Sequence, residues 1–246
     1  MHNARALCAA LDIPLKEISI TEAVQQHLMA IGHGGQHDAA YENAQARERT
    51  QILMDICNMV NGLMIGPGDM SELALGFTTY GGDHISMYGV NAGLPKTLIR
   101  QTLRWYSRTN PGALGAALDA ILDTPVSPEL LPGGKDRQKT EDILGPYALT
   151  DFYLWHFLKE GLSPRELYQK AAAAFFGQYP RDTLLNSLQG FFRRFFAAQF
   201  KRSCLPDGPQ VLSISLSPRG GLSLPSDATG KLWLEDITQL MKEELP

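Results

Sequence analysis

Apolar residues repeat at helical spacing through residues 41–60, which form the clearest element in the first half of the chain. The repeating positions are Ile52, Leu53, Ile56, Met59 and Val60. The same kind of pattern predicts further helices, and Thr21 is a suitable N-cap for the second of them. These helices span residues 3–11, 22–30 and 71–75.

Two short apolar runs predict β-strands between these helices. The first is Leu15–Ile20 and the second, Gly62–Gly66, has the composition of a buried strand. Helices alternating with strands are typical of a parallel α/β sheet. Two strands are fewer than such a sheet usually contains, so the predicted sheet is incomplete.

The second half of the chain is predicted to be largely helical. Pro95 opens one helix at its first turn, and Ser163 begins a capping box that ends at Glu166. Residues 123–147 and 202–229 are rich in turn-forming residues and are predicted to be loops. The predicted helices span residues 95–105, 111–122, 150–159, 163 onward, 182–200 and 232–244.

Composition and charge narrow the class of protein. Hydrophobic residues make up 44% and charged residues 20%, which fits an ordinary globular domain. A net charge of −4 gives no electrostatic reason to expect nucleic-acid binding, so an anionic ligand requires a local basic site. Cys8, Cys57 and Cys204 are too few and too scattered for a disulfide framework or a zinc site. The sequence shows no signal-peptide pattern or long apolar run, and the cytoplasm is the expected compartment.

The residues that follow the strand at 62–66 are a candidate ligand site. Ligands of parallel α/β sheets bind beyond the carboxyl ends of the strands. Residues 66–72 read GPGDMSE, so that glycines are followed by a helix start whose free N–H groups suit an anion. The same pattern also fits a plain strand–turn–helix connection, in which Asp69 or Ser71 caps the helix.

A second candidate lies at residues 77–84, with the sequence FTTYGGDH. Hydroxyls, a carboxylate and an imidazole in a turn suit a sugar or an aromatic ring, but also a well-capped loop. Basic residues near helix ends could meet an anion or simply complement helix dipoles. They are Lys96, Lys139 and the pair Lys201–Arg202. The His33–His37 run contains two glycines, so we predict a loop there instead of a metal-binding helix.

Five blocks of sequence carry a resemblance to a known family. They span residues 41–58, 64–100, 121–132, 138–158 and 191–228, and include the motifs ENAQ, FTTYGGDH, PKT and QFKRS. In this order the blocks resemble the synthetase domain of glutamine-dependent NAD synthetases, within the N-type ATP pyrophosphatase superfamily. The resemblance implies an incomplete adenine-nucleotide α-hydrolase-like, Rossmann-like parallel sheet, with residues 1–246 forming one N-terminally truncated synthetase domain.

The resemblance also implies a reaction. ATP adenylates the nicotinate carboxylate of deamido-NAD, and ammonia then displaces AMP to give NAD. Mg2+ neutralises phosphate charge as pyrophosphate leaves. In full-length relatives a separate glutaminase supplies the ammonia, and family members form a homodimer or larger homo-oligomer.

Individual positions carry roles over from the family. The resemblance places deamido-NAD against Asn43, Glu72, Phe77, Thr78, Thr79, Tyr80, Asp83 and Lys201. It places ATP against Pro67, Lys96 and Ser127, assigns Glu72 to Mg2+ as well, and suggests that Arg47 holds a phosphate. Local roles compete with these: Asn43 could cap a helix, Glu72 could face a helix dipole, and Lys201 could be a surface lysine.

The chain departs from the family pattern in two places. Pro67 stands where the family has a threonine that contacts ATP, and proline offers neither a hydroxyl nor a backbone N–H. The loss of about one hydrogen bond, on the order of 1 kcal/mol, should weaken ATP binding several-fold. The family's SGGxDS loop, which cradles pyrophosphate, does not occur in this sequence.

These departures leave two main hypotheses. In the first, the chain is a truncated part of a catalytic NAD synthetase. In the second, it is a non-catalytic fragment that binds deamido-NAD or associates with a partner subunit. A third reading, a GMP or asparagine synthetase of the same superfamily, is disfavoured by the ENAQ, FTTYGGDH and QFKRS motifs.

Overall fold

The computed structural model of the chain describes residues 2–124 and 145–243. Two short strands, β1 (Ile65–Gly66) and β2 (Tyr88–Gly89), pair in parallel with Ile65 opposite Tyr88. The helices are α1 (His2–Ala10), α2 (Thr21–Ala30), α3 (Ala39–Val60), α4 (Met70–Leu75), α5 (Lys96–Thr109), α6 (Ala113–Asp123), α8 (Tyr147–Glu160), α9 (Pro164–Ala174), α10 (Arg181–Ala197), α11 (Gln199–Arg202) and α12 (Lys231–Lys242).

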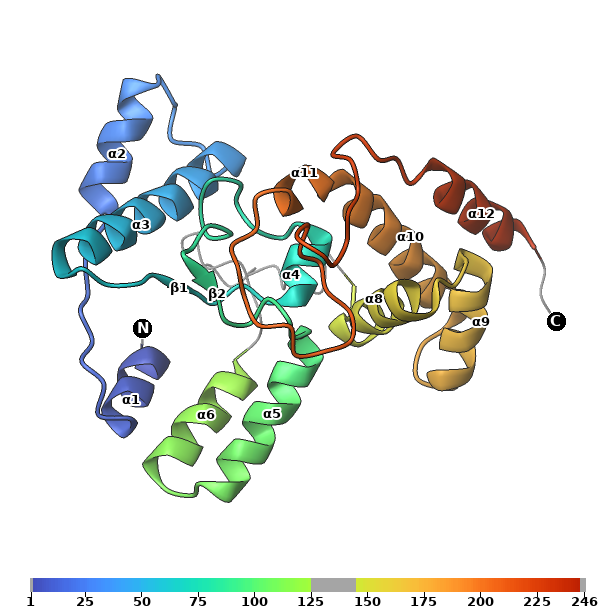
Figure 1. Ribbon diagram of the computed structural model, residues 1–246, viewed down its shortest axis with the longest axis horizontal. Coiled ribbons are helices and arrows are strands. Elements are labelled where there is room, and N and C mark those ends of the chain that lie inside the picture. Colours follow the sequence, from blue (N-terminus) through green and yellow to red (C-terminus); the bar gives the residue numbers. More distant parts are fainter. Residues whose placement is uncertain (1, 125–144, 244–246) are drawn as a thin grey trace.

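The sheet and α4 occupy the centre of the molecule, as Figure 1 shows. Helices α2 and α3 lie on one side of this centre, and α8 to α12 lie on the other. The loop after α11 returns across β2 and α4 before it reaches α12. Segments far apart in the sequence therefore surround α4.

The strand predicted at residues 15–20 is wrong. The chain is extended there but pairs with no other strand among the described residues, and Leu15 and Ile18 are each more than 40% exposed. An apolar run forms a strand only where a neighbour completes its hydrogen bonds, which sequence periodicity does not report. The strand predicted at 62–66 is confirmed only at its last two residues, as β1. Strand β2 was not predicted, because two residues carry no periodic signal.

The predicted helices are confirmed with small shifts at their ends. Asp38 caps α3 by accepting a hydrogen bond from the Tyr41 backbone N–H at 3.0 Å. The capping box predicted at Ser163 and Glu166 is present at the start of α9. The helix predicted over 182–200 ends at Ala197 and is followed by the short α11. Most of the loop predicted at 123–147 lies outside the described residues.

The main hydrophobic core is built on α10. Its buried side chains pack between α4, α8, α9 and α12. Phe157 of α8 meets three phenylalanine rings of α10 edge to face, with centroid separations of 5.1–6.3 Å. The α10 side chains in this core are Leu184, Leu185, Leu188, Phe191, Phe192, Phe195 and Phe196. Burial of these large side chains fixes α4 against the C-terminal helices.

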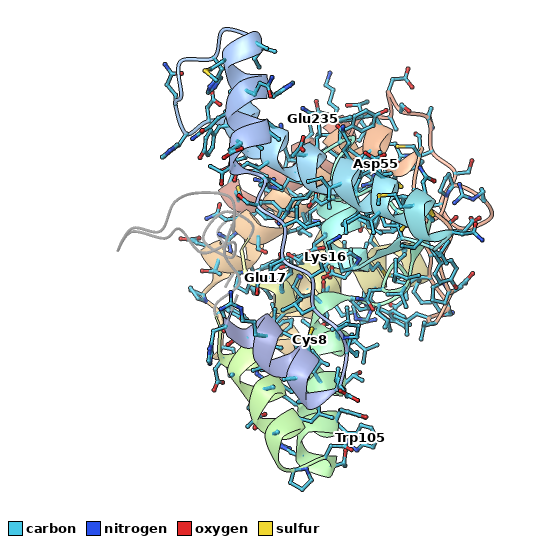
Figure 2. The ribbon with its side chains drawn as sticks, turned by 90° about the vertical axis from the view of Figure 1, so that its left-hand side faces the viewer. Cys8, Lys16, Glu17, Asp55, Trp105 and Glu235 are labelled. Atoms are coloured by element: carbon cyan, nitrogen blue, oxygen red, sulfur yellow. The ribbon has the colours of Figure 1, made fainter. Side chains whose placement is uncertain are left out.

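Helix α1 lies against the α5–α6 hairpin in both views (Figures 1 and 2). The Asn3 side chain donates to the Ala120 carbonyl oxygen and to the Thr124 hydroxyl. An Arg5–Glu17 ion pair holds the extended segment after α1. Across residues 2–124 and 145–243, no helix combines the length and apolar character needed to span a bilayer.

Candidate functional site

Three charged side chains meet at the start of α4. The Lys96 Nζ atom, at the first residue of α5, lies 2.6 Å from Asp69 Oδ2 and 2.8 Å from Glu72 Oε1. Asp69 and Glu72 also form the capping box of α4, since Asp69 accepts from the Glu72 N–H and Glu72 accepts from the Asp69 N–H. The carboxylates therefore hold both the helix start and the lysine.

Burial sets the protonation of this group, which we call the Lys96 cluster. Burial and the nearby Glu72 carboxylate raise the pKa of Asp69, Lys96 opposes both, and the net result is a pKa of about 6. Burial alone would lower the pKa of Lys96, but the two carboxylates outweigh it and hold that pKa above its usual value. Lys96 also lies over the Tyr147 ring, 5.3 Å from its centroid.

Helix α5 is capped by side chains from two other helices. Its own N-cap, Pro95, provides no side-chain acceptor. Instead, Ser71 Oγ accepts from the Lys96 N–H at 2.8 Å, and Asp151 Oδ2 accepts from the Thr97 N–H at 2.9 Å. Ser71 in turn donates to Asp151. This arrangement fixes Lys96 relative to α4 and α8. No motif in the sequence predicted the part that Asp151 plays.

The segment Phe77–Asp83, directly after α4, is a second meeting point. The Thr79 hydroxyl donates to Asn43 Oδ1 of α3 at 2.8 Å, and the Thr79 N–H donates to Asp83 Oδ1 at 2.6 Å. Arg47, one turn further along α3, donates to the Tyr80 carbonyl oxygen at 3.2 Å. Five residues that the family resemblance selected are thus joined by direct hydrogen bonds.

Lys201 holds the same segment from α11. Its Nζ atom donates to the Gly76 carbonyl oxygen at 2.7 Å and to the Thr78 carbonyl oxygen at 2.6 Å. Gly76 has a left-handed φ of 62°, and a Cβ atom there would clash with Ala198. Burial lowers the pKa of Lys201 from its usual value. Lys201 is therefore partly buried and engaged, and is not a solvated surface lysine.

Arg202, considered above only as a cation near a helix end, is almost fully buried at 1% exposure. Its guanidinium donates to the carbonyl oxygens of Leu73 and Ala74 at the end of α4 and to that of Phe195 in α10. Burial lowers the pKa of Arg202 to about 10. This buried cation joins the end of α4 to the C-terminal helices and so places Lys201.

His84, the imidazole of the 77–84 candidate, contacts Cys204, and this pairing was not predicted from the sequence. His84 is 3% exposed, and its Nδ1 atom lies 2.9 Å from the Thr79 carbonyl oxygen and 3.2 Å from the Gly81 nitrogen. Its Nε2 atom lies 3.4 Å from Cys204 Sγ. The wide sequence separation of the pair explains why no motif search found it.

The remaining predicted residues make contacts of other kinds. Pro67 is exposed in the turn between β1 and α4, and its carbonyl oxygen accepts from the Asn91 side chain at 3.1 Å. Phe77 packs against the main core. Tyr80 stacks on His84 at a centroid separation of 5.2 Å. Ser127 lies outside the described residues.

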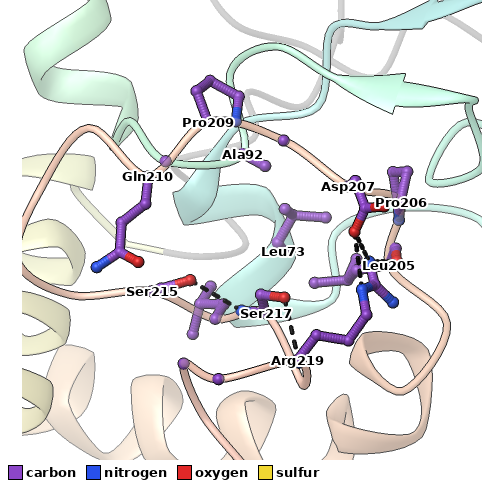
Figure 3. A pocket seen from close by; sticks show the side chains of 15 residues that line it. Leu73, Ala92, Leu205, Pro206, Asp207, Pro209, Gln210, Ser215, Ser217 and Arg219 are labelled. Atoms are coloured by element: carbon purple, nitrogen blue, oxygen red, sulfur yellow. Dashed lines mark hydrogen bonds and ion pairs between the residues drawn. The ribbon is translucent and has the colours of Figure 1, made fainter.

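A cavity of about 250 Å³ opens beside α4, between Ala92–Gly93 and the loop that follows α11 (Figure 3). Ser215, Ser217 and Gln210 supply polar atoms to its wall. Arg219 lies at its edge, where it donates to Asp207 Oδ1 at 2.8 Å and to the Leu205 carbonyl oxygen at 2.7 Å. A smaller space of about 20 Å³, lined by Asp83, His84 and Ser86 among others, lies next to it. That volume suits a single water molecule.

A parallel strand pair with a helix start beyond it is consistent with an α/β protein of the Rossmann-like class. Comparison with known proteins specifies the class further. The sequence model of the NAD synthase family matches residues 1–176, and the chain belongs to that family.

Named relatives agree with this assignment. The chain is 38% identical to the glutamine-dependent NAD(+) synthetase of Mycobacterium leprae over 98% of its own length and 40% of that protein. The crystal structure of a glutamine-dependent NAD(+) synthetase from Cytophaga hutchinsonii superposes with a TM-score of 0.74 at 23% identity, covering 96% of this chain and 38% of that one, and shows the same fold.

An NMN synthetase from Francisella tularensis is 28% identical with a TM-score of 0.51, covering 63% of this chain and 59% of its own. The chain spans about 40% of the length of the glutamine-dependent relatives.

Proposed function

We propose that the chain binds deamido-NAD and takes part in its ATP-dependent amidation to NAD, with ammonia as the nitrogen donor. The observation that carries this proposal is the convergence of Asn43 and Lys201 on Thr78 and Thr79, from helices on opposite sides of α4. Membership of the NAD synthase family supplies the reaction class. Residues that the resemblance assigns to one substrate thus meet around one short segment.

In the proposed reaction, the nicotinate carboxylate of deamido-NAD attacks the α-phosphorus of ATP, and pyrophosphate leaves. Ammonia then attacks the activated carbonyl carbon, and AMP leaves with the bonding electrons. A carboxylate is a poor electrophile, and its conversion to an acyl phosphate makes the second step feasible. Thr79 and Asp83 hold the substrate side of this site, and Lys96 the side of the nucleotide phosphates.

The Lys96 cluster fits a magnesium site completed by phosphate. Two carboxylates and one ammonium leave a formal charge of −1, and the Glu72 side chain is 26% exposed, compared with 5% for Asp69. Mg2+ commonly binds one or two carboxylates together with substrate phosphates. Glu72 would hold the ion, and the ion would neutralise the phosphate charge. With the cation at Glu72, Lys96 would keep its ion pair with Asp69 and turn its remaining N–H donors toward a phosphate.

Calorimetry with deamido-NAD tests the substrate assignment, with NAD as the control ligand because it differs at the carboxylate. NAD formation from deamido-NAD, ATP, Mg2+ and ammonium tests the reaction. Binding with turnover supports the catalytic proposal. Binding without turnover supports the alternative, a non-catalytic fragment that binds deamido-NAD or associates with a partner subunit. Absence of any binding overturns the catalytic proposal, and together with a monomer in sedimentation it overturns the alternative as well.

Nicotinic acid mononucleotide is the third ligand to titrate, because one solved relative is an NMN synthetase. Tighter binding of the mononucleotide than of deamido-NAD would show that the mononucleotide is the preferred ligand, and the proposed substrate would change accordingly. We also propose that the chain forms a homodimer, as the resemblance to the family implies.

A further inference from the structure

The thiol of Cys204 and the imidazole of His84 form a contact that the proposed reaction does not use. Cys204 is exposed, whereas His84 is buried beneath the Phe77–Asp83 segment. Their sulfur and Nε2 atoms lie 3.4 Å apart, within hydrogen-bonding distance for sulfur. A thiol with a base on one side and solvent on the other combines activation with access.

The protonation of His84 suits the role of base. Burial lowers its pKa. The hydrogen bond to Thr79 and the Asp83 carboxylate oppose this effect, and the Lys201 ammonium adds to it. The imidazole is therefore neutral. Nδ1 lies 2.9 Å from the Thr79 carbonyl oxygen and 3.2 Å from the Gly81 nitrogen. Because the shorter contact is to an acceptor, it favours the tautomer with a proton on Nδ1. In this tautomer the Nε2 lone pair faces the sulfur.

We propose that Cys204 is a peroxide-reactive thiol activated by His84, and that its oxidation loosens the Phe77–Asp83 segment. His84 Nε2 takes the thiol proton, and the sulfur attacks one oxygen of hydrogen peroxide. The O–O bond breaks, and the departing hydroxide takes the proton from Nε2 to form water. The sulfur is oxidised by two electrons to a sulfenic acid, and the peroxide is reduced.

The consequence for ligand binding rests on the proposed function. Cys204 Sγ also lies 3.4 Å from the Lys201 carbonyl oxygen, and Lys201 holds the carbonyl oxygens of Gly76 and Thr78. His84 lies under Thr79 on the other side. Both contacts of the sulfur are therefore with residues that position the segment. A sulfenic acid adds an oxygen between them, which displaces His84 or α11.

Cysteine oxidation rates test the first half of the proposal without any ligand. The protein is treated with hydrogen peroxide and dimedone, and peptide mass spectrometry follows each cysteine. Cys204 should react at least roughly tenfold faster in the folded protein than in the urea-unfolded chain at the same pH. Equal or slower reaction in the folded protein overturns the proposal.

Partly buried Cys8 and Cys57 are internal controls, and should react more slowly in the folded protein than when unfolded. His84→Gln should remove the acceleration at Cys204 and leave the Cys8 and Cys57 rates unchanged. If Cys204 keeps its rate in this variant, His84 is not its base. Faster reaction at Cys8 and Cys57 of the variant would reveal that it is unfolded. The comparison of folded with unfolded wild-type protein then decides whether Cys204 is activated.

Binding measurements test the second half. Peroxide should reduce the deamido-NAD affinity of the wild-type protein at least several-fold, and a thiol reductant should restore it. The ratio of treated to untreated affinity should stay at one for Cys204→Ser. A wild-type affinity that peroxide leaves unchanged, with Cys204 shown to be oxidised, overturns the coupling. If untreated protein binds no deamido-NAD, the proposed function fails, while the oxidation rates still decide the chemistry of Cys204.

Discussion

At the scale of single residues, Asp69 shows how burial and function compete. Its carboxylate caps α4, pairs with Lys96 and lies close to Glu72, yet it is 4% exposed. A buried carboxylate is stabilised by the partners that compensate its charge. Removal of one partner leaves a charge buried and unpaired, which costs more free energy than the intact pair contributes. The Lys96 cluster is therefore sensitive to both charge and pH.

Asp69→Asn should change the pH dependence of stability. The pKa of Asp69 is about 6 in the folded protein and near 3.8 in the unfolded chain, so the folded state binds the proton more tightly. The resulting stabilisation is complete below about pH 3.8 and is lost as the pH rises through about 6. Two pKa units correspond to at most about 3 kcal/mol. The Asp69→Asn variant keeps a side chain that can cap α4. It has no carboxyl group at this position to titrate, so its stability should not fall with pH for this reason.

Urea unfolding of both proteins between pH 3.5 and about 7 measures the difference. The free energy of unfolding of the wild-type protein should fall relative to that of the variant across this range. Parallel curves for the two proteins would contradict the raised pKa.

Asn43→Ala should weaken deamido-NAD binding about tenfold. The Asn43 amide orients the Thr79 hydroxyl, and loss of one such hydrogen bond costs about 1–1.5 kcal/mol. Asn58→Ala is the matched control, because Asn58 lies on the same helix and is exposed. Calorimetry compares the two variants. Equal affinities would show that Asn43 plays no part in binding.

At the scale of elements, the first turn of α5 depends on its neighbours. Ser71→Ala removes the acceptor for the Lys96 N–H and a partner of Asp151, whose pKa is raised chiefly by burial. The free energy of unfolding should fall by about 1–2 kcal/mol. The control Ser213→Ala, at an exposed serine in the loop after α11, should lower the free energy of unfolding by less than about 0.5 kcal/mol. Similar losses in the two variants would remove the capping role of Ser71.

The turn between β1 and α4 offers a test of ATP binding. Pro67 is exposed there, and a Cβ atom at the neighbouring Gly68 would meet nothing within 4 Å, so this backbone faces open space. Pro67→Thr supplies a hydroxyl and an N–H and should raise the ATP affinity several-fold over Pro67→Ala, which supplies only the N–H. Fluorescence titration with a labelled ATP analogue measures both. Identical affinities would exclude a contact from the hydroxyl.

Elements with strong local signals could be predicted from sequence, and those that depend on distant partners could not. The periodicity over residues 41–60 and the capping box at Ser163 each identified a helix correctly. The run at Leu15–Ile20 has the composition of a strand but lacks a partner, and β2 is too short to carry a pattern. The family motifs selected Asn43, Thr79 and Lys201, and their roles in ligand binding stay predictions. Arg202, Asp151 and His84 act through contacts between segments far apart in the chain, which no local pattern encodes.

At the scale of the whole molecule, large apolar side chains remain exposed around the end of α3. Met59 is 82% exposed, Val60 67% and Leu63 60%. Apolar side chains gathered in this way mark surfaces for association. Sedimentation velocity should therefore give a species of about twice the 27.1 kDa of one chain.

Met59→Glu should shift that species toward the monomer, because an added charge opposes apolar contact. Phe176→Glu is the control, since Phe176 is 88% exposed and follows α9, on the other side of the molecule (Figure 1). A wild-type protein that sediments as a monomer, or a Met59→Glu variant that stays dimeric, would contradict this interface.

The contacts of Arg202 and Lys201 also determine when the candidate site can form during synthesis. Arg202 joins Ala74 across 128 residues, and Lys201 joins Gly76 across 125. Contacts of such long range close late in folding, because the intervening chain must first be ordered. On the ribosome, the Phe77–Tyr80 segment emerges long before the side chains that hold it. The geometry of the candidate site is therefore complete only after α11 has left the ribosome.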